Sequence, residues 1–254
     1  MSAQALLQSI RSLIFTHLLN GAVASLAEIL DELLETNTTE ILEEVNKVFA
    51  TPEYLHLLIQ IIKQDPGLFE KMRRESYYHE NGFHKIVLLS GRNFKLRLHH
   101  FGASAKAPME NIHDHRWAFS SSILDGSLEM DLFEASAGGE GAEKLFHFIY
   151  DSDKQTGSYN THLKGFANIR KAATRIYNAG ESYLMLPHEL HRIKNQPGEE
   201  SITLILTGKP KSKRCNLYAR RKILDQEKIT TAYSAASLNS MLDQIIETIF
   251  PKKN

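Results

Sequence analysis

The stretch NIHDHRWAFSSSILDG, from Asn111 to Gly126, carries two histidines one residue apart, then an apolar-rich run and a glycine. In an extended strand, residues i and i+2 face the same side, so we expect His113 and His115 to project together and Asp114 to point away. Two imidazoles on one face can reach one divalent ion, but a protein metal centre needs at least a third ligand. Alone, the stretch predicts either part of a metal site or a pair of surface histidines.

A candidate third ligand lies in the stretch LPHELHRIKN, from Leu186 to Asn195. His191 follows a predicted apolar strand and Pro187, which can end that strand. His188, three residues earlier, is an alternative ligand, and Glu110 is a conceivable fourth ligand. The predicted metal ligands are therefore His113, His115 and His191.

The composition is that of a globular protein with balanced charge. The chain has 254 residues, 42% of them hydrophobic, enough for one large domain or one domain with an appended lobe. Thirty basic residues match 30 acidic ones, so no net field favours nucleic acid or an anionic membrane. We therefore expect no nucleic-acid partner and no membrane partner.

Targeting signals and cysteine usage point to the cytoplasm. No apolar run reaches the roughly 18 residues of a membrane span, and the N-terminus lacks the basic region of a signal peptide. The single cysteine, Cys215, excludes an intramolecular disulfide framework, and we expect it in a polar loop without a catalytic role. These features together predict a cytoplasmic protein.

Three regions differ in their predicted secondary structure. In residues 1–75, apolar side chains recur every three or four residues, as in Leu6, Ile10 and Leu13, which predicts helices that pack on the rest of the chain. Residues 76–220 hold short apolar runs between Gly, Asn and Asp, which predicts the strands of a sandwich or barrel. Residues 221–254 return to a helical period and form a predicted C-terminal helical tail.

Two segments of the predicted barrel differ from the simple strand pattern in their local sequence. Asp125-Gly126 is a pair favoured in tight turns, and we expect it to join two strands. The pattern of residues 161–173 is compatible with either helix or loop.

The two histidine stretches together resemble the two motifs of the cupin superfamily. The residues that carry the likeness are His113, His115 and Gly126 in the first motif, and Gly180, Pro187, His191 and Asn195 in the second. The resemblance implies a mainly β fold: a cupin-type double-stranded β-helix barrel, here with an N-terminal α-helical lobe and a C-terminal helix.

Many cupins also carry a glutamate ligand a few residues after the second histidine. Here Phe119, Ser120 and Ser121 stand at those places. Cupins with three histidines and no glutamate include the cysteine dioxygenase-like thiol dioxygenases, which residues 77–220 resemble. This resemblance implies non-haem Fe(II) as the cofactor, although zinc, nickel, copper or manganese can occupy the same ligands.

The resemblance also implies which side chains line the pocket. Tyr77 or Tyr78 matches the pocket tyrosine of that branch, and His99 is placed to orient substrate or handle a proton. Arg97 can clamp an anionic group of the substrate or form a salt bridge at the barrel mouth. The implied catalytic residues are Tyr77, Tyr78 and His99, and the implied substrate contacts are Arg97, Phe101, His79, Phe119, Ile205 and Thr207.

The chain departs from the branch where cysteine is recognised. His79 stands near the place of the arginine that holds the substrate carboxylate. Thr203, Ile205 and Thr207 occupy the places of a serine–histidine–tyrosine set, and the cysteine that is cross-linked to that tyrosine would fall near Phe119. We therefore expect a substrate other than cysteine.

These residues favour an iron-dependent cupin dioxygenase that acts on a small molecule, either a thiol or an amino-acid-derived acid. Its expected partners are that substrate and dioxygen, and the protein is expected to be a monomer or homodimer. Two alternatives remain open: a metal-dependent cupin isomerase or lyase, and a non-catalytic cupin that binds a ligand. The cupin resemblance does not choose among them, because one fold hosts many chemistries.

Overall fold

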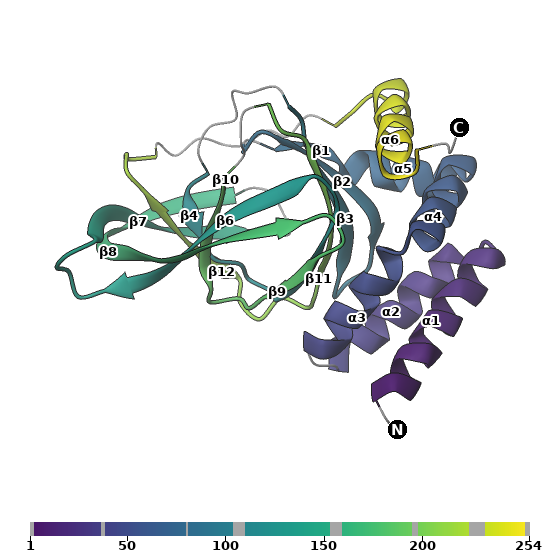
Figure 1. The fold of residues 1–254 in the computed structure, drawn as a ribbon, viewed down its shortest axis with the longest axis horizontal. Helices are drawn as coiled ribbons and strands as arrows, with labels where there is room; N and C mark the ends of the chain where they lie inside the picture. The colour runs from purple at the N-terminus through teal and green to yellow at the C-terminus, as the bar shows by residue number, and fades with distance from the viewer. Residues whose placement is uncertain are drawn as a thin grey trace.

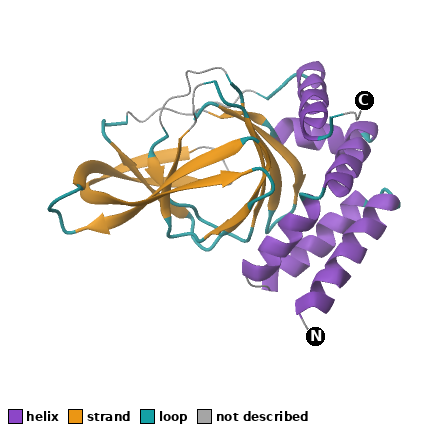
Figure 2. Cartoon of the chain, in the orientation of Figure 1, coloured by secondary structure: helices purple, strands orange, loops and turns teal. Residues whose placement is uncertain are grey.

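The computed structural model describes residues 3–36, 39–79, 81–103, 110–152, 159–194, 198–223 and 232–251. Figure 1 and Figure 2 show the helices gathered on one side of the molecule and the strands on the other. None of the described helices is both long enough and apolar enough to cross a membrane. The helices are α1 (Ala3–Leu19), α2 (Val23–Thr36), α3 (Thr39–Phe49), α4 (Pro52–Gln64), α5 (Pro66–Glu75) and α6 (Ala235–Ile249).

The strands form two antiparallel sheets. The helix-side sheet contains, in spatial order, β1 (Tyr77–His79), β2 (Phe83–Ser90), β3 (Lys95–Phe101), β11 (Ser201–Thr207), β5 (Phe119–Asp125) and β9 (Ser182–Met185). The outer sheet closes on itself in the order β10 (Leu190–Lys194), β4 (Ile112–His113), β12 (Arg214–Ala219), β7 (Ala142–Ser152), β8 (Tyr159–Asn178) and β6 (Ser127–Ser136).

The chain passes repeatedly from one sheet to the other. Strands β3, β5, β9 and β11 belong to the helix-side sheet. The strand that directly follows each of them in the chain, namely β4, β6, β10 and β12, belongs to the outer sheet. Such alternation between two facing sheets is the arrangement of a double-stranded β-helix. The predicted fold class, mainly β with helices before and after the barrel, is confirmed.

The structure corrects the expectation at Asp125-Gly126. The pair does join two strands, but it is not a hairpin turn, because β5 pairs with β11 and β9 whereas β6 pairs with β8 and β10. Gly126 has a φ of +70°, and a Cβ there would lie 2.1 Å from the backbone oxygen of Glu200. The glycine therefore carries the chain from one sheet to the other through a space that no side chain fits.

Residues 161–173, for which helix and loop were both open, belong to a strand. They lie inside β8, which pairs with β7 along its first half and with β6 along its second half. Strand β8 is hard to predict from the sequence, because much of it is exposed and its apolar residues alternate little.

The helices pack on one face of the helix-side sheet. Leu96 and Leu98 of β3 and Leu204 of β11 are buried in the same apolar core as Val45 and Phe49 of α3. A fully buried polar contact adds to this core: Asn46 of α3 donates from Nδ2 to the hydroxyls of Ser120 and Ser122 on β5, at 3.2 and 3.1 Å. Strand β5 is thereby held from the helix side, while its other face points into the barrel.

The opposite face of the helix-side sheet, here called the inner face, faces the outer sheet. Its apolar side chains share a second core with Leu128 and Met130 of β6. They are Phe83, Phe101, Phe119, Ile123, Tyr183 and Met185. The two faces follow the period of two along each strand, so the register of the sheet decides which polar residues enter the barrel.

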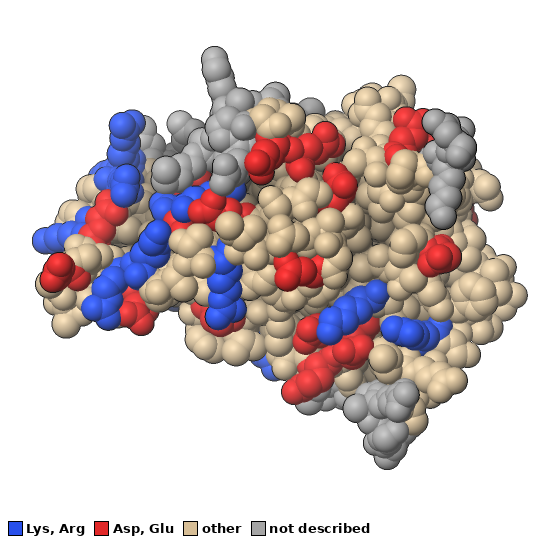
Figure 3. Space-filling model, viewed as in Figure 1, with Lys and Arg blue, Asp and Glu red and all other residues tan. Residues whose placement is uncertain are grey.

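Charged side chains of both signs are interspersed on the described surface that Figure 3 presents. Ion pairs join neighbouring strands of the outer sheet, among them Arg170 with Glu134 and Arg214 with Asp151.

Candidate metal centre in the barrel

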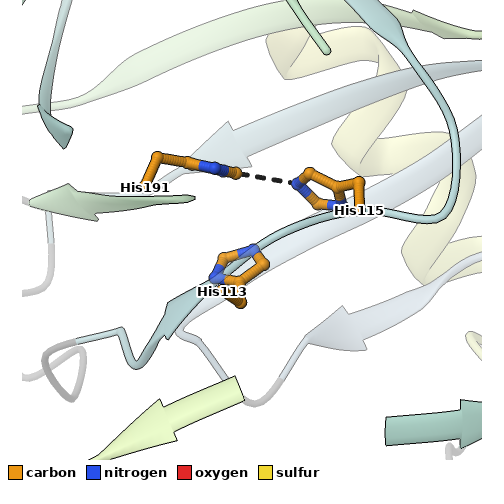
Figure 4. Close-up of side chains that lie close together, drawn as sticks. All are labelled: His113, His115 and His191. Atoms are coloured by element: carbon orange, nitrogen blue, oxygen red, sulfur yellow. Dashed lines mark hydrogen bonds between the residues drawn. The ribbon is translucent and has the colours of Figure 1, made fainter. Parts of the chain in front are cut away.

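Two of the predicted ligands lie directly opposite each other on neighbouring strands. His113 of β4 and His191 of β10 are Cα partners in an antiparallel pair. His115 comes just after β4 ends, and its backbone N–H donates to the oxygen of Pro187 at 3.2 Å. The strand predicted for both histidines is therefore shorter than expected, yet the loop contact still turns His115 toward the other two (Figure 4).

The three imidazoles converge. One candidate ligand atom from each of His113, His115 and His191 lies within 4.8 Å of the other two. The Nε2 atoms of His115 and His191 are 3.3 Å apart. Two nitrogens that each bind a metal at about 2.0–2.1 Å are roughly 3.0–3.5 Å apart, so this pair already has the separation of two ligands. The predicted convergence is confirmed, and metal binding itself stays a prediction.

Backbone carbonyls hold two of the rings in one tautomer. His113 donates from Nδ1 to the oxygen of Asn111 at 2.9 Å, and His191 donates from Nδ1 to the oxygen of Glu189 at 3.3 Å. A carbonyl oxygen can only accept, so the proton sits on Nδ1 and the Nε2 lone pair is left for a metal. This is the usual outer support of a histidine ligand.

Burial disfavours the charged form of two of the three imidazoles. His191 is 3% exposed, and burial, together with the neighbouring His113, lowers its pKa to about 3. Burial and the same neighbour also lower the pKa of His115 well below its usual range. Metal binding requires neutral imidazole, so at neutral pH His115 and His191 need not lose a proton before they bind an ion.

Asp114 points away from the imidazoles, as the strand period predicts, and fixes the ligand segment. Its buried carboxylate accepts hydrogen bonds from the backbone N–H and the side-chain Nδ2 of Asn216 on β12, both at 2.6 Å. His147 of β7 donates to the other side-chain atom of that asparagine, Oδ1, at 2.8 Å. Sequence reasoning missed Asn216 and His147, because both are remote from the motif along the chain.

The two alternative ligands lie outside the cluster. His188 is exposed in the turn before β10. Glu110 accepts hydrogen bonds from the side-chain amide of Asn81 and, at 2.7 Å, from the backbone N–H of Ile193. Among the described residues, the side chains that could hold a metal together are His113, His115 and His191, and neither His188 nor Glu110 belongs to this group. Asn195, the last residue of the second motif, lies outside the described residues.

Phe119 lies against the cluster. Its ring meets His115 edge-on, with centroids 4.9 Å apart, and lies 6.2 Å from His191. Ile205, on the inner face, packs in the same apolar core. Thr207 is buried beside Phe119 on the neighbouring strand, and its hydroxyl accepts from the backbone N–H of Lys95 at 3.0 Å. Phe119 thus forms a wall next to the imidazoles, while the Thr207 hydroxyl is engaged by backbone.

The sheet register separates the two candidate tyrosines. Tyr77 pairs with Lys85, and Lys85 pairs with His99, so these three share the inner face. Tyr78 points to the opposite face, where it is 55% exposed and lies on His84. The structure therefore brings Tyr77, and not Tyr78, to the side of the sheet that faces the imidazoles.

The other predicted pocket residues also lie on the inner face. Phe83 contacts three of them through its ring: His79 at 4.6 Å, His99 at 4.5 Å and Phe101 at 4.8 Å between centroids. The guanidinium of Arg97 lies 5.3 Å from the ring of Trp117, which in turn stacks on His115 at 6.1 Å. A continuous run of side chains thus leads from the imidazoles to Arg97.

Cys215 does not lie in a polar loop. It is part of β12, its thiol is 3.9 Å from the oxygen of Tyr150, and burial raises its pKa to about 12. The thiol therefore stays protonated, which agrees with the expectation that it has no catalytic role.

Comparisons with known proteins give only distant likenesses. No family model matches the sequence, and no curated protein matches it. Among solved structures, hydroquinone 1,2-dioxygenase PnpCD, in complex with Cd²⁺ and 4-hydroxybenzonitrile, matches 56% of this chain and 71% of its own at 14% identity and a TM-score of 0.32. An RmlC-like cupin from Shewanella frigidimarina NCIMB 400 matches 52% and 80% at 12% identity and a TM-score of 0.30.

A third similar structure is an uncharacterised conserved protein with a double-stranded β-helix domain from Klebsiella pneumoniae subsp. pneumoniae MGH 78578. It matches 57% of this chain and 93% of its own at 14% identity and a TM-score of 0.32. At such low scores the likenesses do not extend to an activity, a substrate or a metal for this chain.

Proposed function

We propose that this chain is a metal-dependent cupin enzyme: a non-haem iron dioxygenase that acts on a small thiol or amino-acid-derived acid other than cysteine. The observation that carries the proposal is the convergence of His113, His115 and His191, with ligand atoms within 4.8 Å of one another. The lowered pKa values of His115 and His191 and the two Nδ1 hydrogen bonds to carbonyls suit this donor set to a divalent ion.

Three uncharged imidazole ligands would leave the double positive charge of a bound ion in place. That charge would lower the pKa of a coordinated thiol, alcohol or enol. Fe(II) would also supply dioxygen chemistry. The chain's own residues have simpler tasks. Phe119 and Trp117 flank His115 with aromatic surface. His99 is held neutral, since burial and the nearby Lys85 lower its pKa well below its usual range, so it presents an uncharged imidazole that would orient the substrate by hydrogen bonding.

Two features support a substrate other than cysteine. Thr203, Ile205 and Thr207 replace the serine–histidine–tyrosine set of cysteine dioxygenase-like enzymes. His79, near the place of the carboxylate-binding arginine, stacks on Phe83. Recognition of cysteine through those groups is therefore replaced by a different set of contacts.

The decisive experiment is metal analysis after anaerobic purification of the full chain. We expect about one iron per chain in the wild type, and loss of nearly all of it in His113→Ala and in His191→Ala, because each variant removes one of three ligands. His188→Ala is the matched control, since this exposed histidine lies in the same motif outside the cluster and its variant should keep the iron.

Oxygen uptake with a panel of small thiols and catechols then tests the reaction. Uptake that depends on His113 supports a dioxygenase. Stoichiometric zinc or nickel without uptake would instead favour an isomerase or lyase. A wild-type protein that holds no metal under anaerobic conditions would overturn the proposal and leave a non-catalytic ligand-binding cupin.

A further inference from the structure

Lys85 is a cation on the inner face of the helix-side sheet that the proposed metal chemistry does not use. It lies in β2, between Phe83 and Val87 on the same face, and its Cα partners are Tyr77 on β1 and His99 on β3. Its ammonium donates to the Tyr77 hydroxyl at 2.8 Å and lies 4.8 Å from the centre of that ring. The side chain is half-buried, so it forms part of the wall rather than extending into solvent.

The surroundings of Lys85 are unfavourable for an isolated positive charge. Burial lowers the pKa of the Lys85 ammonium well below its usual range, and Arg97, Lys95 and Arg116 lower it further, while Glu75, which pairs with Lys95, acts in the opposite direction. Its hydrogen-bond partner, Tyr77, is a neutral hydroxyl. A half-buried ammonium among other cations is stabilised when an anion binds beside it, because the anion offsets both the desolvation and the repulsion.

Arg97 is a diagonal neighbour of Lys85 on the inner face. It is 8% exposed and lies in β3 two residues before His99, the Cα partner of Lys85, so these side chains point to the same face. Its guanidinium lies over Trp117, the ring that stacks on His115. Lysine supplies a compact charge and arginine a planar pair of donors, a combination that suits a small oxyanion.

We propose that Lys85, with Arg97, forms an oxyanion subsite that holds the acidic group of the substrate while its other end reaches the three histidines. This proposal extends the proposed function and depends on it in one respect: the bound anion is part of a substrate only if the chain is the enzyme proposed above. The group recognised is a small oxyanion, either a carboxylate or a phosphoryl group. Tyr77 positions the Lys85 ammonium through the hydrogen bond between them.

The test is calorimetric titration of the full chain, as purified, with sodium benzoate and, separately, with inorganic phosphate at fixed ionic strength. We expect at least one of the two anions to bind the wild type. Its Kd should rise at least tenfold in Lys85→Met and stay within about threefold of wild type in Lys85→Arg, which keeps the charge. Tighter benzoate binding would assign a carboxylate, and tighter phosphate binding a phosphoryl group.

Three controls make the result interpretable. Lys209→Met removes a charge of the same sign from the surface, where Lys209 pairs with Glu35, and should bind like wild type. Benzamide, the neutral analogue of benzoate, should bind at least tenfold more weakly than benzoate if charge is recognised. Thermal unfolding of Lys85→Met checks that the variant is folded, and Lys85→Gln, which also removes the charge and should raise Kd at least tenfold, tests the subsite if it is not.

The proposal is overturned if neither anion binds, or if Lys85→Met binds the better anion as tightly as wild type. Repeating the titration after removal of metal with a chelator separates the two proposals. Lys85-dependent binding that survives chelation supports the subsite whether or not the protein is an iron enzyme. An iron-loaded protein that binds neither anion leaves the metal centre standing and removes the subsite.

Discussion

Tyr77 and Tyr78 differ by one position in the sequence and by a whole face of the sheet in the structure. The hydroxyl of Tyr77 accepts from Lys85 at 2.8 Å, whereas Tyr78 is 55% exposed against His84. Both were equally compatible with the family tyrosine, because a motif match fixes a position only to within a residue or two. The register, set by pairing with β2, places one of them inside.

The two tyrosines therefore make a matched pair for mutation. Tyr77→Phe should lower the free energy of unfolding by about 1–3 kcal/mol, because it removes the hydroxyl that accepts the hydrogen bond of the half-buried Lys85 ammonium. Tyr78→Phe should change it by less than about 0.5 kcal/mol, as surface substitutions usually do. Urea unfolding of both variants measures the difference, and equal effects would contradict the assignment of faces.

At the scale of elements, the candidate centre is assembled by strands that are neighbours only in space. His113 and His191 come from β4 and β10, and β12 holds the segment between the ligands through Asn216. Strand β4 is only two residues long, so its own pairing gives the ligand segment little rigidity. We infer that the Asp114–Asn216 contact supplies much of that rigidity.

Asn216→Ala should consequently weaken metal binding about 10- to 100-fold while all three ligands remain, the usual cost of losing an outer support. A titration of the metal-free protein with Zn²⁺, followed through the single tryptophan, Trp117, which stacks on His115, measures this affinity. Asn239→Ala, in α6, is the control and should bind like wild type. An unchanged affinity in Asn216→Ala would show that the ligand segment is held by other contacts.

At the scale of the whole molecule, the helical region and the barrel share one core. Side chains of α1 to α4 and α6 are buried in the same apolar cluster as Leu96, Leu98 and Leu206 of the helix-side sheet. The boundary near residue 75 that the sequence predicts is therefore a change of secondary structure across a continuous core. Removal of the helices would expose the face of the sheet that they cover.

We expect the two regions to unfold together. Urea unfolding followed by far-UV circular dichroism, dominated by the helices, and by the fluorescence of Trp117, inside the barrel, should give midpoints that coincide within experimental error. Val45→Ala in α3, fully buried in the shared core, should lower both midpoints equally, because truncating a buried side chain destabilises the whole cooperative unit. Two separated transitions would indicate that the helices and barrel are independent domains.

The sequence alone determined the features that depend on local pattern. The helical period predicted the N-terminal helices, as with Ile10 and Leu13, which lie in α1. The identity and spacing of His113, His115 and His191 predicted their convergence, because imidazole is a metal ligand wherever a fold gathers it.

Only the tertiary structure decided which other residues meet there. It placed Tyr77 inside and Tyr78 outside, made Gly126 a crossing between sheets, and brought Lys85 beside His99 and Asn216 beside Asp114. Each of these contacts joins strands that are far apart in the chain or depends on strand register. Such pairing is fixed by the packing of the whole molecule, and a one-residue change of register would send every side chain of a strand to the opposite face.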